Sequence, residues 1–327
     1  MIPRHELSPN ISVFWKALPA LTAAVAAVLV SHVMPLLGPL LLALVLGAVL
    51  ANTRWAQKSV LADHAAATKL LLRIGVVLIG LRLSLGEIAS IGVRGVVVIV
   101  VTVAATYGLT QYAGRRAGLD HQFVTLLSAG FSICGAAAVA AVNDAVNARQ
   151  RDVALAVALV TVYGSGMIVA VPLLAGWLGL SGRQAAIWAG ASIHEVAQVV
   201  AAGSALGGGA IGVALTVKLG RVALLAPLYT VAARESRTAG ARVPIVPWFL
   251  TGFAVAVAVR SSGIVPGRVL SVLDVVTTVL LAAGMFGLGL GFRVRELWPV
   301  PGRALWLATT STAVAAGSSL LLIVALY

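Results

Sequence analysis

The chain has 327 residues, of which 60% are hydrophobic and only 10% are charged, and its mean hydropathy is +1.04. Soluble domains carry about 25% charged residues, and here the deficit extends along the whole chain, which predicts a polytopic membrane protein. The formal net charge of +13 does not indicate nucleic-acid binding, because the basic residues lie in short segments between apolar stretches and form no continuous basic face.

The apolar stretches predict an all-α membrane protein, because a spanning helix needs about 20 mainly apolar residues. We expect a bundle of about eleven transmembrane helices in a single domain, 1–327. The expected segments are 16–34, 37–53, 68–86, 92–112, 121–147, 152–176, 183–205, 208–232, 244–261, 269–291 and 303–326. Alternate loops carry fourteen against six Lys and Arg residues, which predicts an inner-membrane protein with a cytoplasmic N-terminus.

Two parts of the chain resemble each other weakly, at 79–85 and 286–292, and the segments before them also align. The matched segments are seven apart in the predicted order, and an odd separation gives opposite orientations. We therefore expect inverted repeats, with halves of roughly 35–176 and 182–327.

Two short polar sequences interrupt long apolar stretches, Ser132-Ile133-Cys134-Gly135 and Ser192-Ile193-His194-Glu195. Lipid tolerates unpaired backbone or charge only where protein or a water-filled cavity receives it. These interruptions predict two discontinuous helices that form a transport site at the membrane midplane. If the two interrupted segments, 121–147 and 183–205, both cross the membrane completely, they cross it in the same direction. This conflicts with a simple inverted repeat unless one is a re-entrant hairpin; the loop charges favour full crossings, and the question stays open.

The candidate substrate-binding residues are Ser132, Cys134, Gly135, Ser192, Lys218 and Arg221. Gly135 permits a backbone break, and the amides freed there carry partial positive charge that suits an anion. Lys218 and Arg221 share one helix face near the middle of a predicted segment, where two cations need Glu195 or an anionic substrate as partner. Packing of small residues and snorkelling of the two cations are the structural alternatives.

The candidate residues for proton or ion coupling are His194, Glu195 and Gln198. Helical spacing would place His194 and Gln198 on one face with Glu195 beside them. Burial disfavours the charged form of both a carboxyl group and an imidazole, which suits a proton-coupled carrier. A structural pair that joins two helices is the alternative.

The stretches SICGAAAVAAV (132–142), SIHEVAQVVAAG (192–203), VKLGRVALLAP (217–227) and IGLRLSLGEIASIG (79–92) carry a family resemblance. The chain resembles the YeiH-type family of bacterial inner-membrane proteins, to which sulfate export is ascribed. Length and helix count fit this family along the whole chain. The resemblance implies a fold similar to the wider cation/proton antiporter and anion transporter group, in which discontinuous helices cross at the binding site.

Together these features predict a secondary transporter of a small anion, such as sulfate or another sulfur oxyanion, with proton coupling. A cation/proton antiporter using Glu195 and Asp144 is the first alternative; an intramembrane enzyme with His194 and Glu195 as acid and base, and a membrane scaffold, are the others. The sequence has no metal-ligand spacing and no P-loop, so we expect no cofactor and no enzymatic activity. The expected partners are the substrate and the lipid bilayer; a homo-oligomer is compatible with the sequence, but no face for it is identified.

Overall fold

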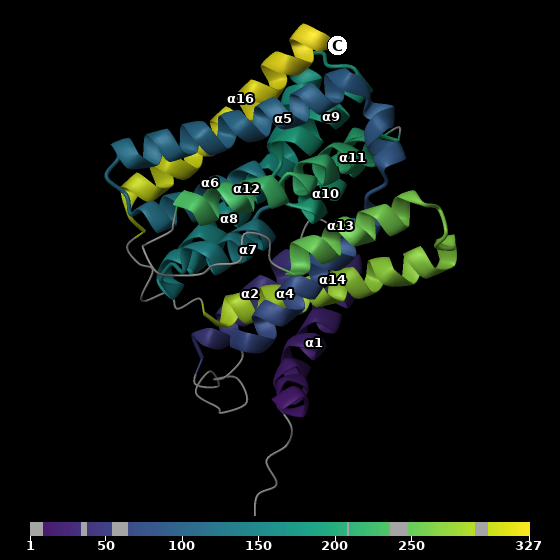
Figure 1. Cartoon of the computed structure of the whole chain (residues 1–327). Helices are drawn as coiled ribbons and strands as arrows, with labels where there is room; N and C mark the ends of the chain where they lie inside the picture. Colours follow the sequence, from purple (N-terminus) through teal and green to yellow (C-terminus); the bar gives the residue numbers. More distant parts are fainter. Residues whose placement is uncertain (1–8, 34–37, 54–64, 208, 236–247, 292–299) are drawn as a thin grey trace, which may run out of the picture.

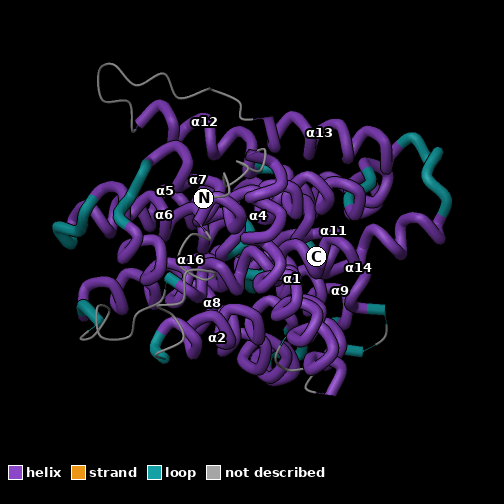
Figure 2. Tube along the Cα trace, turned by 90° about the horizontal axis from the view of Figure 1, so that it is seen from below, coloured by secondary structure: helices purple, strands orange, loops and turns teal. Residues whose placement is uncertain are grey.

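A computed structural model of the chain describes residues 9–33, 38–53, 65–207, 209–235, 248–291 and 300–327. Throughout these ranges the regular secondary structure is helical, without a strand (Figure 2). The predicted all-α class is therefore confirmed for the part of the chain that the structure describes.

The helices follow the predicted segments in order. They are α1 (Pro9–Val33), α2 (Pro39–Ala51), α4 (Ala65–Ile79), the 3-10 turn η2 (Gly80–Arg82), α5 (Leu85–Arg116), α6 (His121–Ser132), α7 (Ala136–Val146), α8 (Gln150–Trp177), α9 (Gly182–Ser192), α10 (Val196–Leu206), α11 (Ala210–Ala223), α12 (Leu225–Glu235), α13 (Trp248–Ser261), α14 (Gly267–Leu290) and α16 (Gly302–Leu326). Among the described residues, five helical stretches are long and apolar enough to cross a membrane, namely α5, α8, α11 with α12, α14 and α16.

The helices form two bodies (Figure 1). One body contains α5 to α12 and α16, and the other contains α1, α2, α4, α13 and α14. Within the second body α14 packs closely on α2 and α4 through small residues. Gly47 of α2 lies against Gly289 of α14, and Gly75 of α4 lies against Leu281. Such contacts let helix backbones approach closely, which is how helices associate in lipid.

Both interrupted segments are helical hairpins. Gln122, at the start of α6, donates a hydrogen bond of 2.9 Å from Nε2 to the carbonyl of Val146, at the end of α7. The open ends of this pair are therefore adjacent, and α7 returns along α6. The expectation that 121–147 crosses the membrane as one broken helix is wrong, because the chain reverses at the break.

The second hairpin is visible in its contacts with α11. Gly190 of α9 lies against Ala214 and Val217, while Gly203 of α10 lies against Ile211. The chain thus runs along α11 in one direction through α9 and returns through α10. The segment 183–205 is also a hairpin and not a full crossing.

The two hairpins open toward opposite faces of the molecule, which we call face A and face B. Helices α5 and α16 run antiparallel and define these faces, because Arg303 donates to the carbonyl of Ala117 at one end and the Tyr327 hydroxyl donates to that of Ile91 at the other. Face A holds the helix ends near 116–121, 146–150 and 302, and face B holds those near 82–85, 177–182 and 206–210. The hairpin α6–α7 opens to face A, and α9–α10 opens to face B.

Local sequence explains where the first hairpin begins and turns. The Asp120 side chain caps α6 by accepting from the backbone N–H of Gln122 at 3.0 Å, as expected for an N-cap residue. The chain reverses at Gly135, whose φ of 78° is readily adopted only by glycine. A helix of 12 residues such as α6 is about 18 Å long. This length carries the turn to about the middle of a bilayer whose hydrocarbon core is about 30 Å thick.

Candidate functional site

The turns of the two hairpins meet beside the middle of α8 and the C-terminal end of α11. The first turn contains Ile133 and Gly135, and the second contains Ile193 and Glu195. A β-carbon on Gly135 would lie 2.5 Å from Cγ of Glu195. The two interruptions that the sequence singled out are therefore brought into direct contact.

Arg221 of α11 binds the backbone of both turns. Its guanidinium donates six hydrogen bonds to five carbonyl oxygens at the C-terminal ends of α6 and α9, those of Phe131, Ser132, Gly190, Ala191 and Ile193. The side chain is completely buried. The last carbonyls of a helix lack partners within the helix and carry partial negative charge, so a buried cation is well placed there.

Lys218 lies one turn earlier on α11 and joins the two hairpins in the same way. Its Nζ donates to the carbonyl of Ile133 at 2.7 Å and to that of Ile193 at 2.8 Å. An ammonium has three donors, so one N–H is left after these two bonds. The prediction that both cations have a buried role is confirmed by their burial. Their hydrogen-bond partners in the structure are backbone carbonyls, and the expectation that Glu195 or an anionic substrate balances their charge stays a prediction.

Glu195 occupies the N-terminal ends of the two returning helices. Its Oε1 accepts from the backbone N–H of Ala136, the first residue of α7, at 3.4 Å, and from the Thr161 hydroxyl at 3.5 Å. The same side chain caps α10 in a reciprocal arrangement with Gln198, whose Oε1 accepts from the backbone N–H of Glu195 at 3.1 Å. Helix N-termini attract anions, so the carboxylate lies where an anionic ligand would also be stabilised.

The strength of these contacts differs between the cations and the carboxylate. Lys218 and Arg221 make several hydrogen bonds below 3.0 Å, whereas the contacts of Glu195 with Ala136 and Thr161 lie at the long limit for a hydrogen bond. The cations are therefore fixed parts of the scaffold. The carboxylate is held more weakly and can be displaced at lower cost.

His194 lies apart from this carboxylate. Its Nε2 is 3.3 Å from the Thr312 hydroxyl of α16, and its ring packs edge-on against Phe131 with centroids 4.7 Å apart. Its Nδ1 is buried and makes no hydrogen bond with any residue that the structure describes. The helical spacing assumed for His194 and Gln198 does not hold, because α10 begins only at Val196. Gln198 instead faces α8, where its Nε2 donates to the carbonyl of Thr161.

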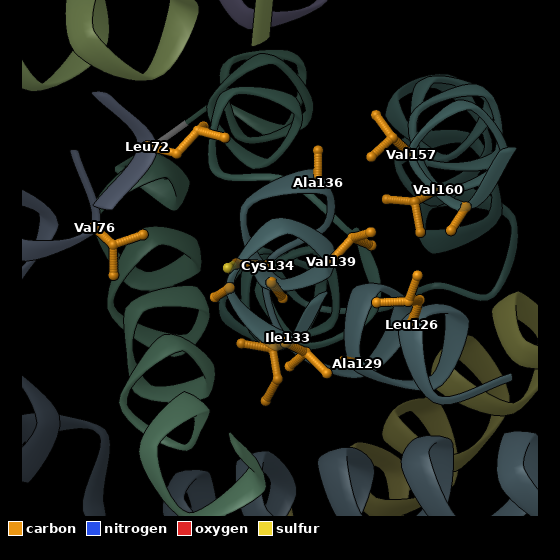
Figure 3. Packing of buried hydrophobic residues seen from close by; sticks show 14 of the residues in the cluster. Leu72, Val76, Leu126, Ala129, Ile133, Cys134, Ala136, Val139, Val157 and Val160 are labelled. Carbon is orange, nitrogen blue, oxygen red and sulfur yellow. The ribbon is translucent and has the colours of Figure 1, made fainter. Parts of the chain in front are cut away.

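The small residues of the turns act through packing and backbone. The hydroxyl of Ser192 donates to the carbonyl of Trp188 within its own helix, and that of Ser132 donates to Ala129. Cys134 is buried among apolar side chains of the turn and its neighbours (Figure 3). Gly135 supplies the reversal. The assignment of Ser132, Cys134, Gly135 and Ser192 as substrate-binding residues stays a prediction.

Cavities approach the turns from both faces, between the two bodies. On face A a narrow cavity of about 70 Å³ lies between α4 and α7 and reaches Ala137 in the first turn of α7. On face B two adjoining hollows of about 610 and 750 Å³ share part of their lining and reach Val196 in the first turn of α10. Each cavity thus ends at the N-terminus of a returning helix, with Glu195 between them.

Two ion pairs that the sequence did not indicate connect the bodies. On face A, Arg73 of α4 binds Asp144 of α7 with an Nη2–Oδ2 distance of 2.6 Å, and Lys69 lies 3.8 Å from the same carboxylate. On face B, Arg260 of α13 binds Glu87 of α5 at 3.2 Å. The residues of the first pair are 71 positions apart in the sequence and those of the second are 173 positions apart, so no local spacing could reveal these pairs.

The position of Asp144 separates it from the site. It lies at the face A end of α7, eight residues or about 12 Å along the helix from Ala136. The pair of carboxylates required by the antiporter alternative, Glu195 and Asp144, is therefore not brought together. Within the described ranges no group of three or more His, Cys, Asp or Glu residues is arranged to hold a metal ion.

Comparison with known proteins gives a consistent set of relatives. The family model described as conserved hypothetical protein 698 matches residues 17–308. The chain is 40% identical over 296 residues to the UPF0324 membrane protein of Corynebacterium glutamicum, and this alignment covers 89% of the chain and 86% of the relative. It is 37% identical over 282 residues to the UPF0324 inner membrane protein YeiH of Escherichia coli K12, with 82% and 80% covered. No solved structure matches the chain.

Proposed function

Because the chain belongs to the UPF0324 family of membrane proteins, we propose that it is a secondary transporter, and not an enzyme, that moves a small anion across the inner membrane. One observation carries this proposal. The turns of two oppositely directed hairpins meet between cavities that open to opposite faces. Irregular backbone at membrane depth is tolerated where it lines a substrate path.

The two-body arrangement supports alternating access. The cavity on face B is wide and that on face A is narrow, as expected for a carrier open to one side. Movement of the hairpin body against the body of α1, α2, α4, α13 and α14 would widen one cavity while it narrows the other. Such a movement must break the Arg73–Asp144 pair in one direction and the Arg260–Glu87 pair in the other.

The charges at the turns favour an anion as substrate. Lys218 and Arg221 leave the buried cluster with more positive than negative charge when Glu195 is ionised and His194 is neutral. The first turns of α7 and α10 also contribute partial positive charge at the ends of the cavities. An oxyanion such as sulfate would fit two converging helix N-termini, and the remaining N–H of Lys218 is a further donor.

Glu195 provides a route to proton coupling. Its carboxylate takes the position between the helix N-termini, so an entering anion must displace a like charge. Protonation of Glu195 removes that repulsion and frees the amide of Ala136. We therefore propose that one proton is taken up at Glu195 for each anion bound.

The distribution of basic residues supports a cytoplasmic face A. When both hairpins are counted as re-entrant, alternate connecting segments of the sequence carry fifteen and five lysines and arginines, compared with fourteen and six for eleven full crossings. By the positive-inside rule this larger bias supports a cytoplasmic N-terminus. The richer set is Arg4, Lys16, Arg54, Lys58, Lys69, Arg115, Arg116, Arg149, Arg151, Arg234, Arg237, Arg242, Arg293, Arg295 and Arg303, and the poorer set is Arg82, Arg94, Arg183, Arg260 and Arg268.

Two re-entrant hairpins also make the predicted repeats geometrically consistent. We propose that α2, α4, α5, α6–α7 and α8 correspond to α13, α14, α16, α9–α10 and α11–α12, in a circularly permuted order. Each pair then runs in opposite directions across the membrane. The conflict that arises if both interrupted segments cross fully disappears, because one hairpin opens to each face.

Anion flux into proteoliposomes tests the proposed function. Purified wild-type protein is assayed with sulfate, sulfite, thiosulfate and chloride under imposed pH gradients. We expect uptake of an oxyanion that responds to the gradient, and Glu195→Gln to retain binding while it loses the pH response. The matched control is Asp152→Asn, which removes a carboxylate at the face A end of α8 that pairs with Arg149 of the same segment.

The alternatives predict other results. Flux of sodium against protons, with no oxyanion flux, would support the cation/proton antiporter and overturn the anion proposal. Oxyanion flux with an unchanged pH response in Glu195→Gln would retain the carrier and refute the coupling role of Glu195.

A further inference from the structure

A basic and aromatic patch lies at the face A ends of α5 and α16, away from the hairpin turns. We define it by Tyr112, Arg115 and Arg116 of α5 together with Arg303 and Trp306 of α16. Two hollows of about 610 and 510 Å³ adjoin there and share Arg116 in their lining. We propose that this patch is a binding site for the headgroup of an anionic phospholipid.

The arginines line the two shallow hollows. The guanidinium of Arg116 lies 5.1 Å from the ring centroid of Tyr112, and Arg303 donates from Nη1 to the carbonyl of Ala117 at 3.3 Å. Arg115 lies 3.7 Å from Glu235, an acidic residue that lines the same hollow. The charges of Arg115, Arg116 and Arg303 together with that of the Glu235 carboxylate sum to a net charge of about +2, which suits a phosphate-containing ligand. Arginine is well suited to phosphate because of its planar set of donors.

The apolar surroundings favour a lipid over a soluble anion. Tyr112 and Trp306 are 58% and 52% exposed, as expected for aromatic side chains at a membrane interface. Leu109 continues this exposed surface toward the middle of α5, and Leu305 is an exposed apolar residue beside Trp306 on α16. On α5, Leu109, Tyr112 and Arg116 recur at helical spacing and so share one face. A ligand with an acidic head and an apolar tail would contact both parts, whereas a free anion would contact only the arginines.

Basic residues at face B, the opposite end of the molecule, offer a natural control. Arg94 is an exposed basic residue near the face B end of α5, and Arg268 lies at the start of α14 on that face. Neither lines the two hollows. A general attraction of anionic lipid to positive charge would involve these residues equally, but a built site would not.

Native mass spectrometry of the full-length protein in detergent tests the proposal, with phosphatidylglycerol as the probe. The double variant Arg116→Gln, Arg303→Gln is compared with wild type and with Arg94→Gln, Arg268→Gln. A basic residue near a membrane surface contributes roughly a factor of five in lipid affinity, so the first variant should bind about 30-fold more weakly. We expect the control variant to bind like wild type.

Three results would overturn the proposal: equal affinity in both double variants, equal binding of phosphatidylcholine, or competition by millimolar inorganic phosphate, which would indicate a site for a soluble anion. If the double variant is less stable without lipid, Arg116→Gln alone decides the question, because Arg116 packs on Tyr112, an exposed ring of its own helix. That single change should weaken binding about fivefold.

Discussion

Replacement of Arg221 by methionine should be far more destabilising than replacement of Lys218. Arg221 serves five backbone carbonyls at the hairpin turns, and Lys218 serves two, with Ile193 shared between them. Arg221→Met therefore leaves four carbonyls without a cationic donor, because Lys218 still serves that of Ile193. Lys218→Met leaves only the carbonyl of Ile133 without one. The difference follows from the geometry and not from the charge, which falls by one in both variants.

The expected magnitudes follow from the cost of a buried acceptor without its hydrogen bond, about 1–3 kcal/mol. Four such carbonyls give a loss of roughly 4–12 kcal/mol for Arg221→Met, which is comparable with the total stability of a typical folded protein, about 5–15 kcal/mol. Lys218→Met should lose only about 1–3 kcal/mol. We expect Lys218→Met to fold with a lower melting temperature and Arg221→Met to yield little folded protein.

The chain supplies its own probe for this measurement. Cys134 is the single cysteine and is buried beside the turn. A thiol-reactive fluorogenic dye added to detergent-solubilised protein will therefore report the temperature at which this region opens. Arg94→Met, a change at an exposed position of α5, is the matched control and should melt like wild type.

Equal melting temperatures for Arg221→Met and wild type would refute the role of the guanidinium as a cap for the two helix ends. A Lys218→Met protein less stable than Arg221→Met would also contradict it, because stability would then follow something other than the number of carbonyls served.

Two further variants test the turn and the motion. Gly135→Ala should lower the free energy of unfolding by about 1–3 kcal/mol from its positive φ alone and should impair flux. The control Gly166→Ala, whose added carbon meets no atom within 4 Å, should change neither stability nor flux. The dye assay measures the stability of each variant, and proteoliposome uptake measures its flux. Asp144→Asn breaks the ion pair across face A and should speed maleimide labelling of Ala137→Cys in the cavity there. Glu87→Gln, which breaks the pair on face B, should slow it, and equal rates in both variants would contradict the alternating-access model.

The sequence predicted the helices well because their signal is local. Apolar length locates a helix without knowledge of its neighbours, and the interruptions at Gly135 and Glu195 marked the breaks. The sequence could not tell a hairpin from a crossing. A segment of about 27 residues with a central break can span the bilayer once or enter it and return, and the two differ only in which helix ends are adjacent. The contact of Gln122 with Val146 decides the first case, and no periodicity encodes it.

The partners of charged groups were also beyond the sequence. Lys218 and Arg221 were correctly expected to be buried, but a sequence displays side-chain charges and hides the partial charges of helix ends. The carbonyls that balance these cations belong to α6 and α9, about 25 to 90 residues away. Likewise, the spacing of His194 and Gln198 had meaning only if a helix ran through both residues.

The balance of helix ends at the turns bears on how a substrate can be bound. Two C-terminal ends are already neutralised by Lys218 and Arg221, so those cations cannot leave without exposing carbonyls. The two N-terminal ends are balanced by Glu195 through longer contacts. Of the charged groups at the turns, Glu195 is therefore the one that can exchange its place with a ligand at low cost. An anion that binds there replaces one negative charge with another, and the site returns to its resting charge if the displaced carboxylate takes up a proton for a monovalent anion. A divalent anion would leave one additional negative charge after the single proton taken up at Glu195, so the net charge that moves with each proton should identify the substrate's charge.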